Sequence, residues 1–344
     1  MDLELLRERA SIIRDVRLFF EQRNYLETDT PLLAPDLIPE SCLEVFETLL
    51  LPPIGSRLPK KPYWLIPSPE IWMKRLIAQH RTNIFQICKC FRNGESSGRW
   101  HNSEFTMLEY YTMEADYMDS LALTGELFGF LLSGMKRRST KGADALDGLS
   151  PPFIRLTVKE AFKRWAGFDL YKASASPDAM EKEAVSLGLN PPSGLSVHEL
   201  YDLIFIHTVE PQLKLERPVA LVDYPAFVPC LAKKSPDGKT AERWELYARG
   251  TELANCYTEE TSPGEVRRFF ESERAEKEKK ALVRHRVDED YWKIFASGDT
   301  GPAENPPSER KKFPACSGVA MGLDRLIMVL CGRATLDGVL PFPQ

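Results

Sequence analysis

Residues 84–111 read IFQICKCFRNGESSGRWHNSEFTMLEYY. Two apolar and aromatic runs, Ile84–Cys90 and Glu104–Tyr111, flank a polar loop that contains glycine, and this pattern predicts two strands joined by the loop. Because side chains alternate between the two faces of a strand, Glu109 shares its face with apolar and aromatic neighbours, where a carboxylate costs free energy unless it meets a cation. The residues expected on this face are Phe105, Met107, Glu109 and Tyr111.

The loop between the two strands has more than one interpretation. Arg92 opens it, and a guanidinium there could clamp a phosphate, although an internal pair between Arg92 and Glu109 is the simpler interpretation of these residues alone. Residues 94–98 read GESSG, a literal G-x-S-x-G. A nucleophile elbow must follow a strand and open a helix, whereas RWHN and a second strand follow here, so Ser96 is not expected to be a nucleophile.

Helical and strand patterns alternate along the rest of the chain. They predict one α+β domain over residues 1–344, with a mainly antiparallel sheet flanked by helices and a mostly helical insertion at about 117–216. Ser68 is predicted to cap a helix whose first position is Pro69. Further helices are predicted over residues 3–23, 267–286 and 323–330, further strands over 26–30, 219–222, 243–256 and 318–322, and loops over 51–62 and 301–314.

The composition argues against several classes of protein. Of 344 residues, 43% are hydrophobic and 28% are charged, which suffices for a globular core, and the net charge of −5 argues against affinity through bulk attraction to nucleic acid. The apolar runs are too short to cross a bilayer or to form a signal peptide. Seven cysteines without a C-x-x-C argue against a disulfide framework or a zinc ribbon. We therefore expect a cytoplasmic protein without membrane attachment.

Residues 250–260 read GTELANCYTEE and carry three acids and an amide within nine residues, directly after an apolar strand over 244–248. Carboxylates at the end of a strand suit Mg²⁺, a hard cation that prefers oxygen ligands and usually shares them with phosphate. An acidic surface turn is an equally good interpretation of this segment alone.

Residues 316–330 read CSGVAMGLDRLIMVL and predict a glycine-bounded strand that leads into an apolar helix. Glycines allow a ligand to approach the backbone, and Arg325 falls in the first turn of the helix, whose N-terminus favours anions. The alternative is that Arg325 pairs with an acid such as Asp324 or Glu70. The coincidence of glycines and an arginine favours a bound anion.

Together, these segments resemble the catalytic core of the class II aminoacyl-tRNA synthetases. Residues 26–31 are similar to motif 1 of that family, residues 91–109 to motif 2 and residues 322–325 to motif 3, and the likeness runs from Leu5 to Phe342. The lysine subgroup is most similar, on SPE (68–70), MKRL (73–76), HNSEFTMLE (101–109) and ELAN (252–255). Because the first helix begins at residue 3, no anticodon-binding domain is expected before it.

Without that domain, and with the sequence CSGVA at 316–320, the chain resembles the lysyl-tRNA synthetase paralogues that modify elongation factor P. The resemblance implies an ATP-dependent ligase that activates (R)-β-lysine as an aminoacyl-adenylate and transfers it to a lysine side chain of elongation factor P. It also implies Mg²⁺, a homodimer and no stable tRNA binding. Activation of α-lysine or another amino acid for a different acceptor is the alternative within this chemistry, and a non-catalytic regulatory paralogue is the alternative outside it.

The resemblance also assigns roles to residues. Arg92 and Arg325 would be catalytic, with Arg92 on the α-phosphate and Arg325 on the γ-phosphate of ATP. Ala320 stands where lysyl-tRNA synthetases usually have glycine, so its methyl group would reshape the amino-acid pocket. The implied ATP-binding residues are Arg92, Asn93, Gly94, Glu95, Asn102, Glu252, Leu253, Gly322 and Arg325; the implied substrate-binding residues are Ser68, Pro69, Glu70, Tyr111, Glu259 and Ala320; and the implied metal ligands are Glu252 and Glu259.

The motif 2 loop is one residue longer than the family pattern, and four positions depart from that pattern. One of them is Trp72, where relatives have a smaller or differently polar residue. Gly94 stands where a glutamate usually follows Arg-Asn, and Glu95 would replace it after a small shift. Cys256 stands where a glycine usually follows Ala-Asn, and Glu260 where the family usually has leucine.

Overall fold

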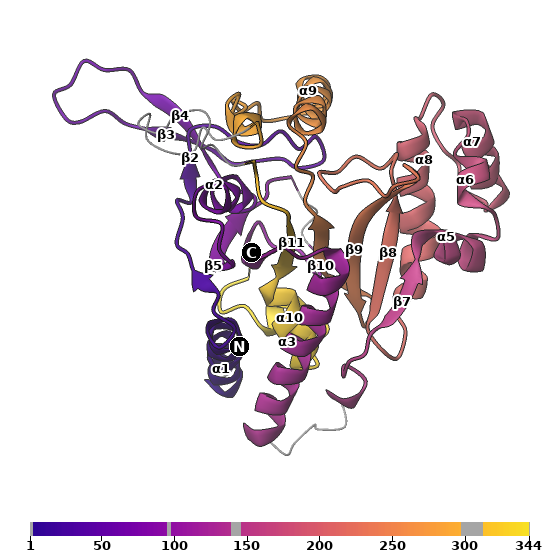
Figure 1. The fold of residues 1–344 in the computed structure, drawn as a ribbon, viewed down its shortest axis with the longest axis horizontal. Helices are drawn as coiled ribbons and strands as arrows, with labels where there is room; N and C mark the ends of the chain where they lie inside the picture. The colour runs from indigo at the N-terminus through magenta and orange to yellow at the C-terminus, as the bar shows by residue number, and fades with distance from the viewer. Residues whose placement is uncertain (1–2, 95–97, 139–145, 297–311, 344) are drawn as a thin grey trace. The chain divides into compact units, whose positions relative to one another are not determined.

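The computed structural model describes residues 3–94, 98–138, 146–296 and 312–343. The chain forms two compact units, residues 1–115 with 259–344 and residues 116–258. Each unit contains a mainly antiparallel group of strands accompanied by helices (Figure 1), which confirms the predicted α+β class. The assignment of the chain to a single domain stays a prediction.

The first unit is built on strands in the order β1-β5-β6-β11. β1 pairs with β5 in parallel, and the other neighbours are antiparallel. The predicted strand at residues 26–30 is shorter than expected, because only its first two residues pair with β5. Its elements are α1 (Leu3–Glu21), β1 (Leu26–Glu27), β2 (Leu33–Ala34), β3 (Glu47–Leu50), β4 (Lys61–Leu65), α2 (Glu70–His80), β5 (Ile84–Phe91), β6 (Glu104–Met113), α9 (Pro263–Lys280), η4 (Tyr291–Ile294), β11 (Cys316–Gly322), α10 (Leu323–Leu330) and η6 (Leu336–Gly338).

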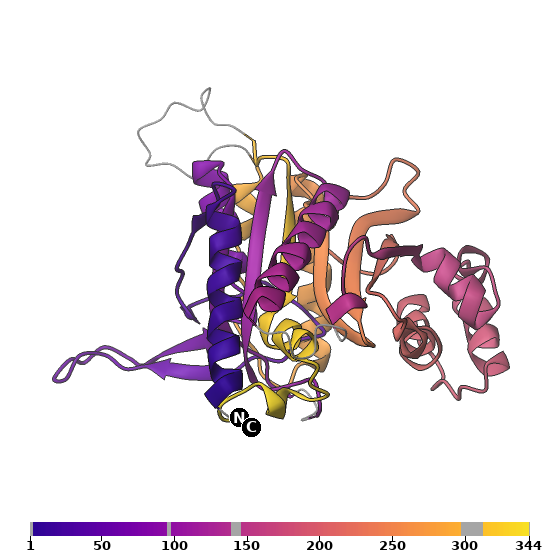
Figure 2. The ribbon, with the colours of Figure 1, turned by 90° about the horizontal axis from the view of Figure 1, so that it is seen from below.

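Helix α1 covers one face of the β5–β6 pair, as Figure 2 shows. The Phe20 ring stacks on Phe85 at 4.9 Å between centroids and lies 4.8 Å from Tyr110, so the apolar stripe that predicted the helix is buried against the sheet. Helix α10 is tied to the same face, because the carboxylate of Asp324 accepts from the Thr106 amide at 2.6 Å and from Arg9 of α1 at 2.5 Å. The opposite face of β6 is therefore left for other contacts.

Strands β3 and β4 form a hairpin that projects from the first unit in both Figure 1 and Figure 2. We call residues 47–62 the arm. The sequence predicts only a loop at 51–62, and this prediction is wrong at its end because β4 begins at Lys61. The base of the hairpin is anchored in a small core that contains Val45, Trp64 and Ile66.

The ends of helices α2 and α9 differ from the predicted ends. Helix α2 begins at Glu70, with Pro69 in the capping position. The hydroxyl of Ser68 accepts from the Glu70 amide at 3.1 Å and donates to Glu109. Helix α9 ends at Lys280, so residues 281–286 are not helical. It is also less solvated than its charges suggest, because Glu273 and Lys277 are buried against the segment before β3.

The second unit has strands in the order β10-β9-β8-β7. The prediction of a mostly helical segment at 117–216 misses strand β7. The acidic segment after residue 250 is a strand that pairs with β9, because Arg249 and Gly250, both with positive φ, form a tight turn between them. Its elements are α3 (Tyr117–Arg138), β7 (Ile154–Thr157), α5 (Val158–Ala161), η1 (Phe162–Ala166), α6 (Leu170–Ala173), α7 (Pro177–Ser186), α8 (Val197–Ile204), η2 (Phe205–Val209), η3 (Glu210–Leu213), β8 (Val219–Pro225), β9 (Thr240–Ala248) and β10 (Thr251–Thr258).

Two predictions from the composition concern disulfides and membrane-spanning segments. All seven cysteines are free thiols. In the part of the chain that the structure describes, no helix combines the length and the apolar character needed to span a membrane.

Candidate active site

The face of β6 opposite α1 carries a buried carboxylate, Glu109. Its Oε2 accepts from the Ser68 hydroxyl at 2.7 Å and its Oε1 accepts from the Tyr111 hydroxyl at 2.7 Å, while only 2% of the residue is exposed. The alternative of an Arg92–Glu109 brace is therefore not needed to explain this carboxylate, because both of its oxygens already have hydroxyl donors. Both donors are neutral hydroxyls, and Glu109 forms no ion pair with a cation among the described residues, so its ionised form is a candidate for binding an ammonium group.

Burial dominates the protonation of Glu109. It raises the pKa of this carboxyl from 4.5 to about 8, and the negative charge of Glu70 adds to the shift, against the hydrogen bonds from Ser68 and Tyr111 and the charge of Lys74. The same burial raises the pKa of Tyr111 well above its ordinary value, so its hydroxyl remains a donor. Without a ligand, Glu109 is thus mostly protonated at pH 7.

Two further carboxylates, those of Glu70 and Glu259, lie near Glu109 and are bridged by a lysine. Lys74 Nζ lies 2.6 Å from Glu70 Oε1 and 2.6 Å from Glu259 Oε2, and only 1% of the lysine is exposed. Burial alone would lower the pKa of Lys74, but the charges of Glu259 and Glu70 outweigh it and raise the pKa well above 10.5. Lys74 therefore holds one oxygen of each carboxylate and limits the orientations that both can adopt.

Sequence reasoning missed Lys74 as a member of the site. The spacing of Glu70 and Lys74 by four residues on a helix could have indicated their ion pair. Tyr291 of η4 was missed as well: it is fully buried and its hydroxyl has no hydrogen-bond partner among the described residues. The charges of Lys74 and Glu70 act on the pKa of Tyr291, which burial raises well above 10, so the ring belongs to the same cluster.

Strand β11 closes the cluster from the neighbouring position in the sheet. Gly318 is paired with Tyr111 and Ala320 with Glu109, so both lie on the pocket face of the sheet. A Cβ on Gly318 would lie 2.5 Å from Glu259 Oε1 and 2.5 Å from the Tyr111 ring. The glycine is therefore required by the close approach of two pocket side chains.

We expect Gly318→Ala to lower amino-acid-dependent catalysis by at least about tenfold, because the added methyl group must displace Glu259 or Tyr111. Gly264→Ala, at an exposed position in the first turn of α9 where the nearest side-chain atom lies 3.9 Å away, is the matched control. Steady-state kinetics of both variants measures the effect. Equal kinetics for the two would show that the pocket tolerates the methyl group.

The loop that follows β5 places the predicted nucleotide-binding residues. The Arg92 guanidinium lies over the Phe105 ring at 5.2 Å, and the Arg92 amide donates to the Ser103 carbonyl at 3.0 Å. Asn93 donates from its amide to the Glu44 carbonyl at 2.9 Å, and Gly94 has a φ of +68°, which suits glycine. Asn102 donates to the Glu104 carbonyl. Glu95 and Ser96 lie outside the described residues.

Helix α10 begins directly after Gly322, which occupies its N-cap position, and Arg325 lies in its first turn. Its Nε donates to the Trp100 carbonyl at 2.9 Å, which fixes the guanidinium beside the loop of Arg92. The two acids considered as alternative partners have other partners: Asp324 is paired with Arg9, and Glu70 with Lys74. An anion remains the predicted ligand of Arg325, because the first turn of a helix favours anions.

The predicted metal ligands stand in different units. Glu252 and Leu253 lie on β10 of the second unit, whereas Glu259 is the first residue of the returning segment of the first unit. Glu259 already belongs to the ammonium cluster through Lys74. In the described part of the chain, no group of three or more histidine, cysteine, aspartate or glutamate side chains could hold a metal ion by itself. Their joint role at Mg²⁺ therefore stays a prediction.

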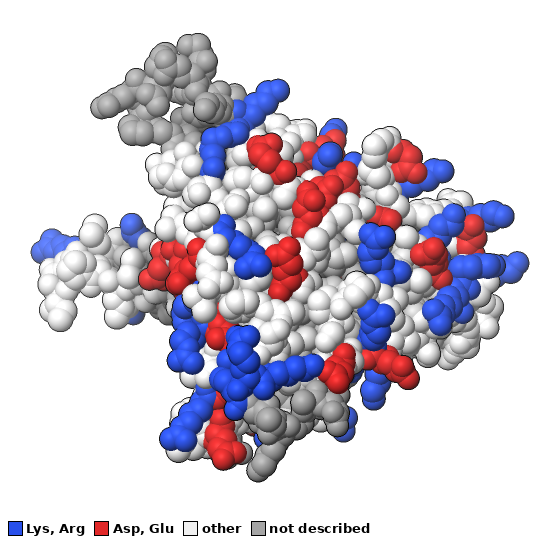
Figure 3. All heavy atoms as spheres, turned by 60° about the horizontal axis from the view of Figure 1, so that its bottom comes forward, with Lys and Arg blue, Asp and Glu red and all other residues white. Residues whose placement is uncertain are grey.

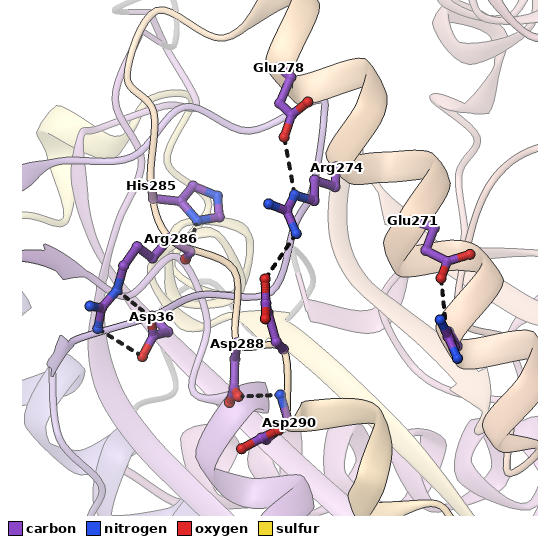
Figure 4. A network of polar contacts seen from close by, with 10 residues as sticks. Asp36, Glu271, Arg274, Glu278, His285, Arg286, Asp288 and Asp290 are labelled. Atoms are coloured by element: carbon purple, nitrogen blue, oxygen red, sulfur yellow. Dashed lines mark hydrogen bonds and ion pairs between the residues drawn. The ribbon is translucent and has the colours of Figure 1, made fainter.

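A charged cavity of about 770 Å³ lies between α9 and residues 284–290, and Figure 4 shows its network. Arg274 pairs with Glu278 at 3.1 Å and with Glu289 at 3.2 Å. Arg286 pairs with Asp36 at 2.7 Å. Since these cations and acids neutralise one another, the network is a brace for the segment that carries Tyr291 rather than a second site.

Comparisons with known proteins show the family of the chain. Residues 3–344 match the family model described as tRNA synthetases class II (D, K and N). The chain is 33% identical over 341 residues to an elongation factor P–(R)-β-lysine ligase of Avibacterium paragallinarum, covering 99% of this chain and 95% of the relative. Proteins with the same name from Proteus mirabilis (33%, covering 98% and 94%) and Haemophilus influenzae (32%, covering 99% and 95%) are similarly close.

Proposed function

The chain belongs to the class II tRNA synthetases of the D, K and N group, and on this basis we propose that it is an ATP-dependent ligase that activates (R)-β-lysine and transfers it to a lysine side chain of elongation factor P. The similarity to ligases of that name extends over nearly the full length of both chains, which supports the same reaction here. An ammonium-binding pocket beside two arginines supports it independently.

The observation that carries the proposal is the group of three carboxylates formed by the buried Glu109 and Glu259 and the partly exposed Glu70, with Lys74 as the cation that pairs with two of them among the described residues. Such a group is costly unless a ligand brings further positive charge, and a diamino acid brings two ammonium groups. We propose that Glu109, with Ser68 and Tyr111, binds one of them. The oxygens of Glu70 and Glu259 that Lys74 does not hold would bind the other.

The proposed reaction has two steps. The substrate carboxylate attacks the α-phosphorus of ATP, so that pyrophosphate leaves and an aminoacyl-adenylate forms. The uncharged ε-amine of the acceptor lysine then attacks the acyl carbon, so that AMP leaves and the amine loses a proton. Arg92 would stabilise the charge that develops on the α-phosphate and Arg325 would hold the γ-phosphate, so catalysis is positioning and charge neutralisation. When bound, Mg²⁺ would neutralise phosphate charge, and Glu252 is the proposed ligand.

We further propose that the protein is a cytoplasmic homodimer. The surface that resembles motif 1 supports a dimer, because α1 and β1 expose large apolar side chains that a second copy could cover. These side chains are Leu3, Leu6, Leu18 and Leu26. No stable complex with tRNA is expected.

The test of the function is ATP–pyrophosphate exchange with (R)-β-lysine, α-lysine and other amino acids offered singly, followed by transfer to purified elongation factor P. We expect exchange to be greatest with (R)-β-lysine and transfer to require the adenylate. Exchange that prefers another amino acid would assign a different substrate. A folded protein that binds ATP but supports no exchange would favour a regulatory role.

Ala320 is the proposed selector between the β- and α-isomers of lysine. It is paired with Glu109 on the pocket face, so its methyl group lies beside the ammonium site. We expect Ala320→Gly to shift the ratio of kcat/KM values towards α-lysine by about tenfold, the usual effect of one methyl group in a pocket. Competition between the isomers in the exchange assay measures the ratio. An unchanged ratio would remove Ala320 from the selection.

A further inference from the structure

The arm, residues 47–62, exposes an unusual amount of apolar surface. Every residue in it except Pro52 is exposed, and four of its leucines are exposed by 47% to 65% while Ile54 is fully exposed. Figure 3 shows the arm at the left as a largely uncharged surface with basic side chains at its outer end. The exposed aliphatic side chains are Leu49, Leu50, Leu51, Ile54 and Leu58.

An isolated two-stranded hairpin is at best marginally stable in water. Single apolar residues are common on protein surfaces, but a contiguous group on a projecting element marks an interaction site. In the described part of the first unit, β4 pairs with β2 and β3, and these pairings leave the outer half of the arm uncovered. As far as the described residues show, this surface is therefore available to a partner.

The root of the arm adjoins the candidate active site. The residue before β3, Phe46, accepts from the Leu65 amide at 3.0 Å, and Glu44 accepts from the amide of Asn93, next to Arg92, at 2.9 Å. After β4, the Ile66 carbonyl accepts from the Phe91 amide at 3.0 Å, and the chain then reaches Ser68 of the substrate pocket. The root of the arm is therefore joined to both the Arg92 loop and the substrate pocket, which places the arm on the same unit as the site of transfer.

We propose that the arm binds the acceptor protein, through an apolar patch bordered by acidic residues on that protein. This inference rests on the proposed transfer to elongation factor P. The arm carries three cations, Arg57, Lys60 and Lys61, against one acid, Glu47, although the whole chain has a net charge of −5. Its charge thus complements an acidic partner and steers its approach.

Two other occupants fit the arm less well. RNA would use the basic side chains, but bases bind on aromatic rings, and the exposed large side chains of the arm are aliphatic. A second copy of the chain has another apolar surface available, on α1 and β1. The aliphatic surface next to the site of transfer therefore favours a protein acceptor.

The test separates activation from transfer. One variant combines Leu49→Ser, Leu51→Ser and Ile54→Ser; another combines Arg57→Ser, Lys60→Ser and Lys61→Ser. The matched control, Val185→Ser with Ile206→Ser, removes aliphatic side chains of similar exposure from the second unit. Each protein is assayed for ATP–pyrophosphate exchange, for transfer of the aminoacyl group to purified elongation factor P and for oligomeric state by light scattering.

We expect the aliphatic variant to retain exchange within about twofold and to lose at least about 30-fold in kcat/KM for elongation factor P, the effect of removing a binding hot spot. The basic variant should lose less and should become insensitive to salt. The proposal would be overturned if the aliphatic variant kept full transfer, or if it lost exchange as strongly as transfer. It would also be overturned if the wild type were a dimer and the aliphatic variant a monomer. If the wild type exchanges pyrophosphate but does not modify elongation factor P, the acceptor is wrong and the proposal falls with it.

Discussion

Arg325→Ala is expected to lower ATP–pyrophosphate exchange by about 10³-fold, the size of effect that a phosphate-binding arginine has in phosphoryl transfer. The Arg325 Nε donates to the Trp100 carbonyl at 2.9 Å, which helps to orient the guanidinium. Alanine cannot supply charge to a γ-phosphate, and the helix N-terminus of α10 with bound Mg²⁺ would be left to neutralise it without a guanidinium. The loss should appear in kcat and in ATP affinity together.

A nearby arginine separates this role from a general effect of charge. Arg333→Ala removes an exposed arginine three residues after the end of α10, and we expect it to leave exchange unchanged. Both variants should unfold within a few degrees of the wild type, because the hydrogen bond from Arg325 to the Trp100 carbonyl is exposed and such bonds contribute about 1 kcal/mol. If Arg325→Ala kept full exchange while folding normally, the phosphate assignment would be wrong.

The parts of the site that lie on regular elements could be predicted from the sequence. The period of two residues on β6 places Glu109 and Tyr111 on one face, and β11 then brings Gly318 and Ala320 opposite them. The glycine-to-helix transition at Gly322 is predicted because the apolar helix that follows it has an unambiguous period. These predictions succeed because side-chain direction in strands and helices follows from spacing alone.

Contacts between distant segments could not be predicted in the same way. Lys74 reads as an ordinary helix residue, and its burial between Glu70 and Glu259 depends on a segment nearly 190 residues later in the sequence. The arm was missed for the opposite reason: its prolines and glycine predict a loop, and only the pairing of Leu49 with Pro62 and Leu50 with Lys61 makes it a hairpin. Register in a ribbon without a buried face leaves little trace in the sequence.

Binding of a diamino acid is expected to release about one proton below pH 8. Glu109, with a pKa of about 8 in the empty pocket, must ionise to bind an ammonium group. Affinity should therefore rise with pH by up to about tenfold per unit and level off near pH 8, until the ligand's own amino groups lose their protons. Titration calorimetry in two buffers of different ionisation enthalpy measures the released proton.

Glu109→Gln should remove the part of this pH dependence that comes from Glu109, and leave the part from Glu259, whose pKa burial raises to about 7. The variant should also weaken binding of the diamino acid by about 100-fold, because a neutral amide matches the protonated carboxyl but cannot form an ion pair with an ammonium group. The pKa of Glu109 is about 8 in the fold against 4.5 ordinarily, so its contribution to stability is complete below pH 4.5 and is lost as pH rises towards 8. Glutamine has no such loss, so the variant should gain stability over the wild type between pH 5 and pH 8, as measured by urea unfolding. Glu245→Gln is the control, since that buried glutamate also accepts from two side-chain hydroxyls, those of Tyr224 and Tyr247, but lies in the second unit, where it pairs with Arg243. It should leave the KM for the amino acid unchanged, and a similar rise in KM in both variants would contradict a specific role for Glu109.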